Sequence, residues 1–464
     1  MSLISSISGI RGTIGGKVGE NLTPIDIVKY VSAFITLLKE NEPNKTLRIV
    51  VGRDARISGE MVNSIVCGTI QSMGADVIDV GLSTTPTVEM SVVSHKADGG
   101  IIITASHNPV PLNALKLLRS NGEFVSGADG VRIQQWVKEA NFTYAEAKKL
   151  GHYSFYENAI ADHIEKILAL EWVDVDAISR ANFNVAVDAV NSTGGIAIAQ
   201  LLKKLGVKRS TILNGEPTGV FAHNPEPLPE HLAEISNLID KNSFHVGFVV
   251  DPDVDRLAIV MENGEMFGEE YSLVAIADYI LQNQKGNTVS NLSSTRALRD
   301  ISEKYGVSYA AAAVGEVNVV EKMKETNAII GGEGNGGIIL PALHYGRDAL
   351  VGIALFLTYM AKTKKSPVQI KSQFPSYFIS KNKIELKPET NVPHILDCVA
   401  EKYKAYSVNR IDGVKVDFED NWIHLRASNT EPIIRIYAEA TNMSIAENLA
   451  KKILNDIKEI INEQ

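Results

Sequence analysis

Short apolar runs rich in β-branched residues alternate along the chain with amphipathic stretches. The apolar runs predict strands, and stretches such as 25–38 and 196–205 predict helices. This alternation is typical of α/β domains with mixed, largely parallel sheets. The predicted strands comprise residues 47–51, 100–103, 185–187, 246–250 and 328–330.

Each of these predicted strands ends at a polar or glycine-rich loop. The loops are GRDAR, TASHNP, DAVNSTGG, DPDVDR and GGEGNGG, in chain order. In open α/β sheets, ligands usually bind beyond the carboxyl ends of the strands, where such loops emerge. We therefore expect the functional residues in these loops.

The last hundred residues have a different pattern, with predicted strands at 411–418, 422–426 and 433–439 and a helix at 444–461. They indicate a smaller α+β domain. At roughly 150 residues per domain, the 464 residues suggest about three domains. The boundaries that we predict give α/β domains at 1–152, 153–255 and 256–368, followed by the α+β domain at 369–464.

Composition and charge narrow the class of protein. The chain is 45% hydrophobic and 22% charged, which is typical of a soluble globular protein, and its formal charge of -9 argues against nucleic-acid binding as its main task. Only two cysteines are present, the start lacks a signal-like leader, and the apolar run 349–361 is too short to span a bilayer. We expect a cytoplasmic protein that has no membrane partner, with 349–361 as a buried helix.

The segment DPDVDR places Asp251, Asp253 and Asp255 at alternate positions before Arg256. On an extended chain such carboxylates share one side, and this cluster of oxygen ligands suits Mg²⁺. A solvated acidic turn is the simpler alternative. A calcium EF-hand is disfavoured, although Glu262 falls at its position 12, because Arg256 replaces the required glycine and the flanks read as strands.

In TASHNP, Ser106 follows an apolar strand, with His107 beside it and Lys116 ten residues later. The serine lacks the flanking glycines of the nucleophile elbow, which disfavours an α/β-hydrolase. Taken alone, the segment also fits a turn that is stabilised by side-chain hydrogen bonds.

Other segments could bind phosphate or hydroxyl groups. RASNTEP supplies Arg426 and hydroxyl donors, and a strand-connecting turn is the alternative interpretation. GGEGNGG lets backbone approach a ligand, with Glu333 and Asn335 as its only side chains able to bind hydroxyls. Further local positive charge comes from Arg11, Arg53 and Arg56, unless these are ordinary surface arginines.

Taken in order, these segments resemble the α-D-phosphohexomutase family of phosphomannomutases, phosphoglucomutases and phosphoglucosamine mutases, of the archaeal or bacterial type. The resemblance covers essentially the whole chain. The matching segments are SGIRG, VGRDARISG, TASHNP, DPDVDR, the pair Gly332 and Glu333, GRDAL at Arg347, and RASNTEP. The family implies an isomerase with three similar α/β domains around a central cleft and a smaller fourth domain.

The resemblance also implies roles for individual residues. Ser106 would carry a phosphoryl group, and one oxygen of that group would bind Mg²⁺ together with Asp251, Asp253 and Asp255. Arg256 would neutralise the phosphate, and a hexose 1,6-bisphosphate would be the intermediate and activator. Glu333 and Asn335 would bind sugar hydroxyls. The phosphate that is not transferred would contact Arg426, Ser428, Asn429, Thr430 and Arg435.

Departures from the family pattern leave alternatives open. Pro252 and Val254 replace the small residues usual in the metal loop, which should stiffen it without removing a ligand. Gly337 stands where a histidine often closes the sugar loop, so the general acid and base are open among His107, Lys116 and Arg11.

The remaining alternatives concern substrate, reaction class and assembly. The sugar could be glucose, mannose or glucosamine phosphate. A metal-dependent sugar phosphatase and a non-catalytic sugar-phosphate or calcium-binding protein are the competing classes. The chain could act as a monomer or a homodimer.

Overall fold

The computed structural model describes residues 1–464 except 1–2, 7–8, 41–44, 388–389, 429–432 and 463–464. The chain divides into two compact units. Unit 1 comprises residues 1–279 and 336–371, and unit 2 comprises residues 280–335 and 372–464.

The first part of unit 1 is a seven-stranded sheet in the order β1-β2-β6-β5-β3-β4-β7. Strands β3, β4, β5 and β7 run parallel, whereas β6 is antiparallel to both β5 and β2. Its elements are β1 (Ile4–Ser6), β2 (Gly9–Thr13), α1 (Pro24–Lys39), β3 (Arg48–Arg53), α2 (Gly59–Ser72), β4 (Asp76–Leu82), α3 (Thr85–Ser94), β5 (Gly99–Ile103), β6 (Leu112–Arg119), α4 (Gly127–Glu139), the 3-10 helix Ala147–Lys149 and β7 (Tyr153–Phe155).

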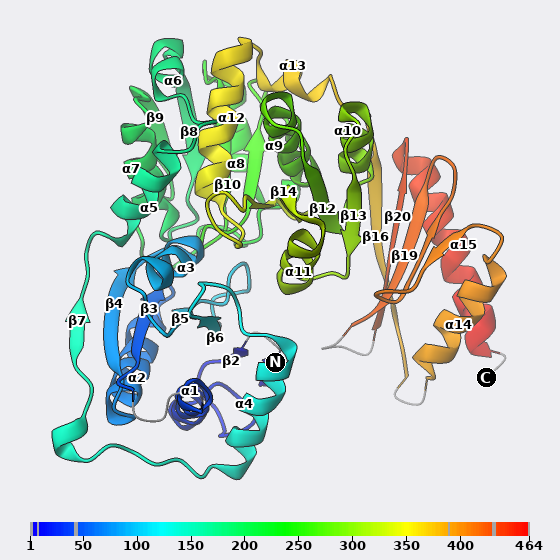
Figure 1. Cartoon of the computed structure of the whole chain (residues 1–464). Helices are drawn as coiled ribbons and strands as arrows, with labels where there is room; N and C mark the ends of the chain where they lie inside the picture. The colour runs from blue at the N-terminus through cyan, green and yellow to red at the C-terminus, as the bar shows by residue number, and fades with distance from the viewer. Residues whose placement is uncertain (1–2, 7–8, 41–44, 388–389, 429–432, 463–464) are drawn as a thin grey trace. The chain divides into compact units, whose positions relative to one another are not determined.

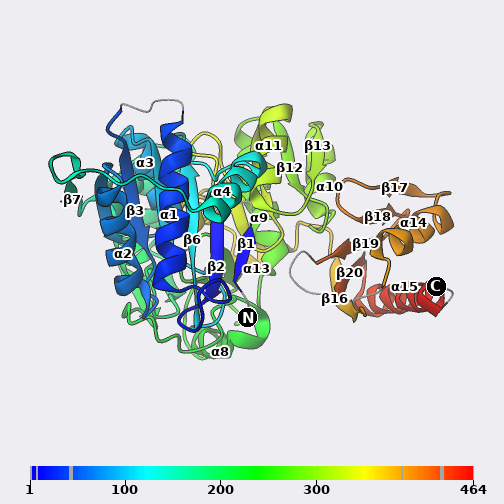
Figure 2. The ribbon, with the colours of Figure 1, turned by 90° about the horizontal axis from the view of Figure 1, so that it is seen from below.

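Alternating side chains of the parallel strands supply two cores on opposite faces of this sheet. Ile49 and Val51 pack with apolar residues of α1, α2 and α4, whereas Val50 packs with Val88 and Val92 of α3. Figure 2 shows α1 and α2 together over the same strands. The period of two that alternates burial across a strand thus explains the helix–sheet–helix layering.

The second sheet of unit 1 has the order β11-β10-β8-β9, with only β11 antiparallel. Because β7 pairs with β4 and β11 with β10, the first sheet extends past residue 152 and the second past residue 255. The elements are α5 (Ala159–Leu168), α6 (Val175–Ala181), β8 (Asn184–Asp188), α7 (Gly194–Lys204), β9 (Arg209–Leu213), the 3-10 helix Pro229–His231, α8 (Ala233–Asp240), β10 (Val246–Val250) and β11 (Leu257–Val260).

Unit 1 also holds β15 (Gly337–Ile339), α12 (Ala349–Thr363) and α13 (Pro367–Lys371). Every residue of α12 from Ala349 to Met360 is buried, which confirms the predicted buried helix. The side chain of Asp348 caps this helix by accepting hydrogen bonds from the backbone N–H groups of Leu350 and Val351. Within the described part of the chain, no helix is both long and apolar enough to cross a membrane.

Unit 2 contains strands of an α/β sheet and a separate antiparallel sheet. Helix α9 (Glu269–Asn283) leads from unit 1 into the α/β part, in which β12 pairs in parallel with β13 and β14. The elements of this part are β12 (Asn287–Asn291), α10 (Ala297–Tyr305), β13 (Tyr309–Ala312), α11 (Glu316–Thr326) and β14 (Ala328–Glu333).

The antiparallel sheet has the order β16-β20-β19-β18-β17, and α14 and α15 cover the same face of it (Figure 1). The predicted α+β character of the C-terminal part is therefore confirmed. Its elements are β16 (Phe378–Glu385), α14 (Val392–Lys402), β17 (Ser407–Asn409), β18 (Val414–Asp417), β19 (Trp422–Ala427), β20 (Ile433–Ala440) and α15 (Met443–Asn462).

Candidate active site

Ser106 lies in the loop after β5 and is 7% exposed. Its backbone adopts φ of 49°, in the left-handed region that non-glycine residues rarely enter. The backbone N–H donates to the hydroxyl of Thr104, and the side-chain Oγ donates to Oδ2 of Asp251 at 2.6 Å. The unusual backbone conformation therefore belongs to a serine whose hydroxyl is directed at the aspartate loop.

The serine loop is held by Arg56, which is 1% exposed. Its guanidinium pairs with the carboxylate of Asp54 at 3.1 Å. Because the guanidinium has five N–H donors, it also binds several carbonyl oxygens of the loop. These belong to Ser106 and Asn108, both at 2.5 Å, Pro109 at 2.9 Å and Leu112 at 3.0 Å. For Arg56, the interpretation as a surface arginine is wrong.

The aspartate loop between β10 and β11 is a tight turn. The Val254 N–H donates to the Asp251 carbonyl, and Val254 takes φ of 61°. The Oδ1 atom of Asp251 accepts from the backbone N–H groups of Asp255 and Arg256, both at 3.1 Å. The expected extended-chain geometry is therefore wrong: the carboxylates converge because the backbone folds around one of them.

The three aspartates of this loop are fully buried, and one ligand atom from each lies within 4.8 Å of the others. Among the described residues, Oδ1 of Asp253 and Oδ1 of Asp255 have no hydrogen-bond partner. A buried carboxylate oxygen without a partner is costly unless a cation binds it. The donor set of hard oxygens and the two orphaned atoms therefore fit a divalent metal ion.

Two cations border the aspartates. Lys116 Nζ donates to Asp253 at 2.7 Å, and Arg347 Nη2 donates to Asp255 at 2.7 Å. Burial alone would raise the pKa of Asp255, but Arg347 and Lys116 hold it well below its usual range. Burial and the neighbouring carboxylates raise the pKa of Asp251. Burial would lower the pKa of Lys116, but Asp253 and Asp255 raise it, so Lys116 stays protonated.

His107 contacts the serine through Nδ1, 3.3 Å from the Ser106 Oγ. Burial and the charge of Arg256 lower the pKa of His107 to about 2, so its ring is neutral. Glu226 lies between these two side chains, 3.9 Å from Nε2 of His107 and 3.5 Å from Nη1 of Arg256. Arg11 reaches the same loop by donating to the Asn108 side chain at 3.3 Å.

Glu333 and Asn335 belong to unit 2. Glu333 ends β14 and is 4% exposed. Its Oε1 accepts from the side-chain amide of Asn291 at 2.9 Å and from the backbone N–H of Gly315 at 3.1 Å. These bonds fix the orientation of the Glu333 carboxylate within its own unit.

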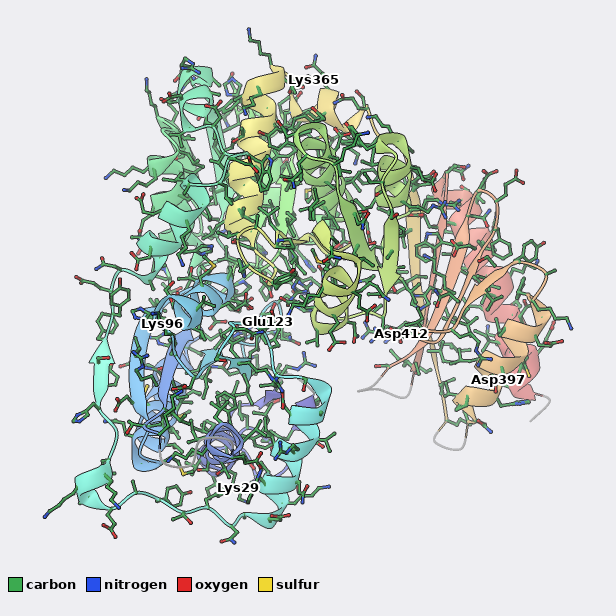
Figure 3. The ribbon with its side chains drawn as sticks, in the orientation of Figure 1. Lys29, Lys96, Glu123, Lys365, Asp397 and Asp412 are labelled. Carbon is green, nitrogen blue, oxygen red and sulfur yellow. The ribbon has the colours of Figure 1, made fainter. Side chains whose placement is uncertain are left out.

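The segment RASNTEP begins at the end of β19, and its residues Asn429 and Thr430 lie outside the described residues. Arg426 pairs in register with Arg435 on β20, and Arg435 pairs with Lys383 on β16. Paired residues of neighbouring strands project from the same face, and a row of like charges there is unfavourable unless an anion binds it. Asp412, marked in Figure 3, offsets one of these charges through an ion pair with Arg426 at 2.9 Å.

The structure thus brings together the predicted residues of unit 1: Arg11, Ser106, His107, Lys116, Asp251, Asp253, Asp255 and Arg256. Sequence reasoning gave no role to Arg347 or Glu226 and did not single out Thr85, whose hydroxyl donates to Asp253 at 2.6 Å. Only Arg347 carried a signal, as part of the quoted GRDAL segment. A threonine at the start of a helix and a glutamate in a loop have too many other roles to be singled out.

Comparisons with known proteins agree with this arrangement. Four models of the phosphoglucomutase/phosphomannomutase family match the chain: alpha/beta/alpha domain I at 4–144, domain II at 161–264, domain III at 269–377 and the C-terminal domain at 387–456. These matches and the site define a phosphohexomutase, which is an isomerase. The chain belongs to the phosphoglucomutase/phosphomannomutase family.

Individual relatives cover nearly the full length. A phosphoglucomutase/phosphomannomutase of Thermococcus kodakarensis is 35% identical over 92% of this chain and 94% of its own. A phosphoglucosamine/phosphogalactosamine mutase of Sulfurisphaera tokodaii is 31% identical over 99% of both chains. A solved family protein from Burkholderia thailandensis has a TM-score of 0.85 at 24% identity and covers 98% of this chain and 97% of its own, which shows the shared fold.

Proposed function

We propose that this chain interconverts hexose 1-phosphate and hexose 6-phosphate by moving a phosphoryl group to and from Ser106. The observation that carries the proposal is the buried Ser106 hydroxyl, 2.6 Å from an aspartate of an acidic cluster with orphaned oxygens. Phosphoryl transfer depends mainly on positioning and on neutralising charge. The serine would give its phosphoryl group to the sugar phosphate, and the resulting 1,6-bisphosphate would return its other phosphoryl group.

We further propose that Asp251, Asp253, Asp255 and the phosphorylated Ser106 hold Mg²⁺. When bound, the ion supplies positive charge that neutralises the phosphoryl oxygens. The chain's own residues then keep the ligands in place. Lys116 and Thr85 hold Oδ2 of Asp253, which leaves Oδ1 of that residue available to the ion.

The three candidates for proton transfer, Arg11, His107 and Lys116, differ in charge, and this difference decides their roles. Lys116 stays protonated beside the aspartates, and Arg11 is an arginine, so both serve as cations for the phosphoryl group. His107 is neutral and its Nδ1 lies 3.3 Å from the Ser106 Oγ, so it is the one of these three candidates with an unprotonated nitrogen near the serine. A phosphoryl dianion beside the imidazole would raise its pKa and make it a better base.

Residues of unit 2 would bind the sugar and the phosphate that is not transferred. Glu333 and Asn335 supply hydrogen-bonding groups for ring hydroxyls. The row of Arg426 and Arg435 supplies charge for phosphate, with Ser428, Asn429 and Thr430 as further donors. We also propose that the four predicted domains each contribute one of these loops: serine, aspartate, sugar and phosphate.

A glucosamine phosphate is the second candidate substrate, because the Sulfurisphaera tokodaii relative carries the name of an amino-sugar mutase. Relative values of kcat/KM on the 1-phosphates of glucose, mannose and glucosamine decide between them. The sugar with the highest value identifies the preferred substrate class.

The test of the reaction class uses glucose 1-phosphate, Mg²⁺ and a trace of glucose 1,6-bisphosphate. Accumulation of glucose 6-phosphate supports the proposal. Release of inorganic phosphate without isomerisation would indicate a phosphatase, and binding without turnover would indicate a binding protein. The matched control is Ser106→Ala, which removes the hydroxyl but keeps the backbone N–H that donates to Thr104.

A further inference from the structure

Unit 1 contains a second buried cluster of ionisable groups, away from the aspartate loop. His163 on α5 and His344 in the loop before α12 both contact Oδ2 of Asp348, through Nε2 atoms at 2.9 Å and 3.3 Å. The Nδ1 atom of His344 lies 3.2 Å from Oε2 of Glu89 on α3. Three elements that are distant in sequence therefore meet at this cluster.

The hydrogen-bonding roles in the cluster follow from its chemistry. The Nε2 atom of His344 donates to Asp348, its Nδ1 atom faces the Glu89 carboxylate as an ion pair, and two flanking carboxylates favour the charged form of a histidine. His344 is therefore an imidazolium between Glu89 and Asp348. His163 needs one proton only, because its Nε2 donates to Asp348 while its Nδ1, at 2.9 Å, can accept from the hydroxyl of Thr87.

Gly346 leaves room for the Glu89 carboxylate beside His344. A Cβ atom at Gly346 would come within 1.8 Å of the Glu89 carboxylate, so a larger residue there would displace that carboxylate. The Oδ1 atom of Asp348 accepts from Leu350 N–H at 2.8 Å and anchors the end of the loop to α12. The segment from His344 to Asp348 is thus fixed at both of its ends.

Residues next to the cluster, in the 344–348 segment and on α3, contact the aspartate loop. Arg347 precedes Asp348 directly and donates to Asp255 at 2.7 Å. Thr85, one helical turn before Glu89 on α3, donates to Asp253. Fixing α3 and the 344–348 segment to each other consequently fixes two of the side chains that contact the acidic cluster.

We propose that His344 and Asp348 are positioning residues, which hold Arg347 against Asp255 so that its guanidinium is in place for phosphoryl transfer. The inference rests on the proposed function, because Arg347 matters only if charge develops beside Asp255. Neither His344 nor Asp348 contacts the reacting atoms. Groups that orient a catalytic side chain typically change the rate by about 10- to 100-fold when they are replaced.

The variant that tests the proposal is Asp348→Asn. The amide oxygen can still cap α12, whereas the amide nitrogen cannot accept from the histidines. We expect kcat to fall about 10-fold with KM for the sugar phosphate nearly unchanged. In an Arg347→Ala background, Asp348→Asn should cause no further loss of kcat, because both substitutions remove the same contribution, the positioned Arg347 guanidinium.

The matched control is Asp278→Asn, which removes another buried carboxylate that accepts from a residue of α12, the Tyr359 hydroxyl at 2.6 Å. It should lower stability but leave kcat unchanged. Additive losses in the Asp348→Asn and Arg347→Ala cycle, or normal kcat in Asp348→Asn, would overturn the positioning role. If Asp348→Asn does not fold, Glu89→Gln replaces it in the double-mutant cycle with Arg347→Ala, because Glu89 is the other carboxylate that contacts His344.

A readout independent of activity separates this inference from the proposed function. Ring nitrogen NMR shifts of His344 in the wild-type protein should show both nitrogens protonated at neutral pH. The side chains of His163, His344 and Asp348 could also hold a metal ion, since their ligand atoms lie within 4.8 Å of one another. Zinc that co-purifies with the wild type and is lost in Asp348→Asn would contradict the imidazolium. Absence of mutase activity in the wild type would refute the proposed function alone.

Discussion

The Ser106 hydroxyl lies 2.6 Å from the Asp251 carboxylate, although 145 positions separate the two residues. Ser106 follows a strand of the first sheet, and Asp251 follows a strand of the second. Both residues are buried, so their hydrogen bond joins the two loops away from bulk water. A phosphoryl group on this serine would therefore be placed directly beside the acidic cluster.

Replacing Asp253 by asparagine should weaken Mg²⁺ binding at least about tenfold, because the change removes charge from one of the two orphaned oxygens. Isothermal titration of Mg²⁺ into the protein measures the effect. Glu262→Gln is the control, since Glu262 is the residue that an EF-hand would require. A larger loss of affinity in Glu262→Gln than in Asp253→Asn would contradict the proposed metal site.

Arg56→Met should destabilise unit 1 by about 3–5 kcal/mol, since it leaves Asp54 as a buried charge without its partner. Urea unfolding measures the change. Adding Asp54→Asn to this variant should recover part of the loss. Arg53→Met, which removes a partly exposed neighbour, is the control, and equal losses in the two single variants would show that burial of Arg56 is not the cause.

Stability at alkaline pH should depend on His344. Burial would lower the pKa of this group, but Asp348 and Glu89 raise it to about 10, compared with about 6.5 for an ordinary histidine. With a raised pKa in the fold, the contribution is complete below about pH 6.5 and is lost as the pH rises toward 10. The neighbouring ionisable groups are Glu89, Asp348 and His163.

The measurement is the free energy of unfolding between pH 7 and pH 10, for the wild type and for His344→Gln. The wild type should lose stability more steeply, because the unfolded chain releases the His344 proton at lower pH. Parallel pH profiles for the two proteins would show that His344 is not held as an imidazolium.

Unit 2 should show the opposite pH dependence through His424. Burial lowers the pKa of this histidine to about 4, and its Nδ1 contacts the Ser293 hydroxyl at 2.8 Å. With a depressed pKa, the neutral ring stabilises the fold above about pH 6.5, and this contribution is lost as the pH falls toward 4. Fluorescence of Trp422, with the other tryptophans replaced, reports on unit 2, and His424→Asn should flatten the acid limb. An unchanged acid limb would contradict the assignment.

Local patterns predicted the fold class and several of its elements. The strand at 246–250 has the predicted bounds, and the helix predicted at 25–38 spans Pro24–Lys39. In both segments the signal lies in the periodicity of neighbouring residues. The C-terminal strands and helix were predicted for the same reason, and their ends differ from the prediction by at most three residues.

The sequence singled out several residues that the structure brings together in unit 1, but it did not predict their geometry. The turn at Asp251 requires a positive φ at Val254, which no local propensity of valine suggests. Arg56 is a charged residue whose partners are mostly carbonyl oxygens 50 to 56 positions away, so its burial leaves no sequence signal. The contact of His163 with Asp348 joins residues 185 positions apart, so the sequence pattern does not predict it either.

The most direct test of the central claim is to locate the phosphoryl group on the protein. After incubation with glucose 1,6-bisphosphate and Mg²⁺, peptide mass spectrometry should find one phosphate per chain on Ser106, and glucose 1-phosphate should discharge it as bisphosphate. The Ser106→Ala variant should remain unlabelled and inactive. Normal turnover in that variant, or phosphate on another residue that exchanges with the sugar, would contradict the account.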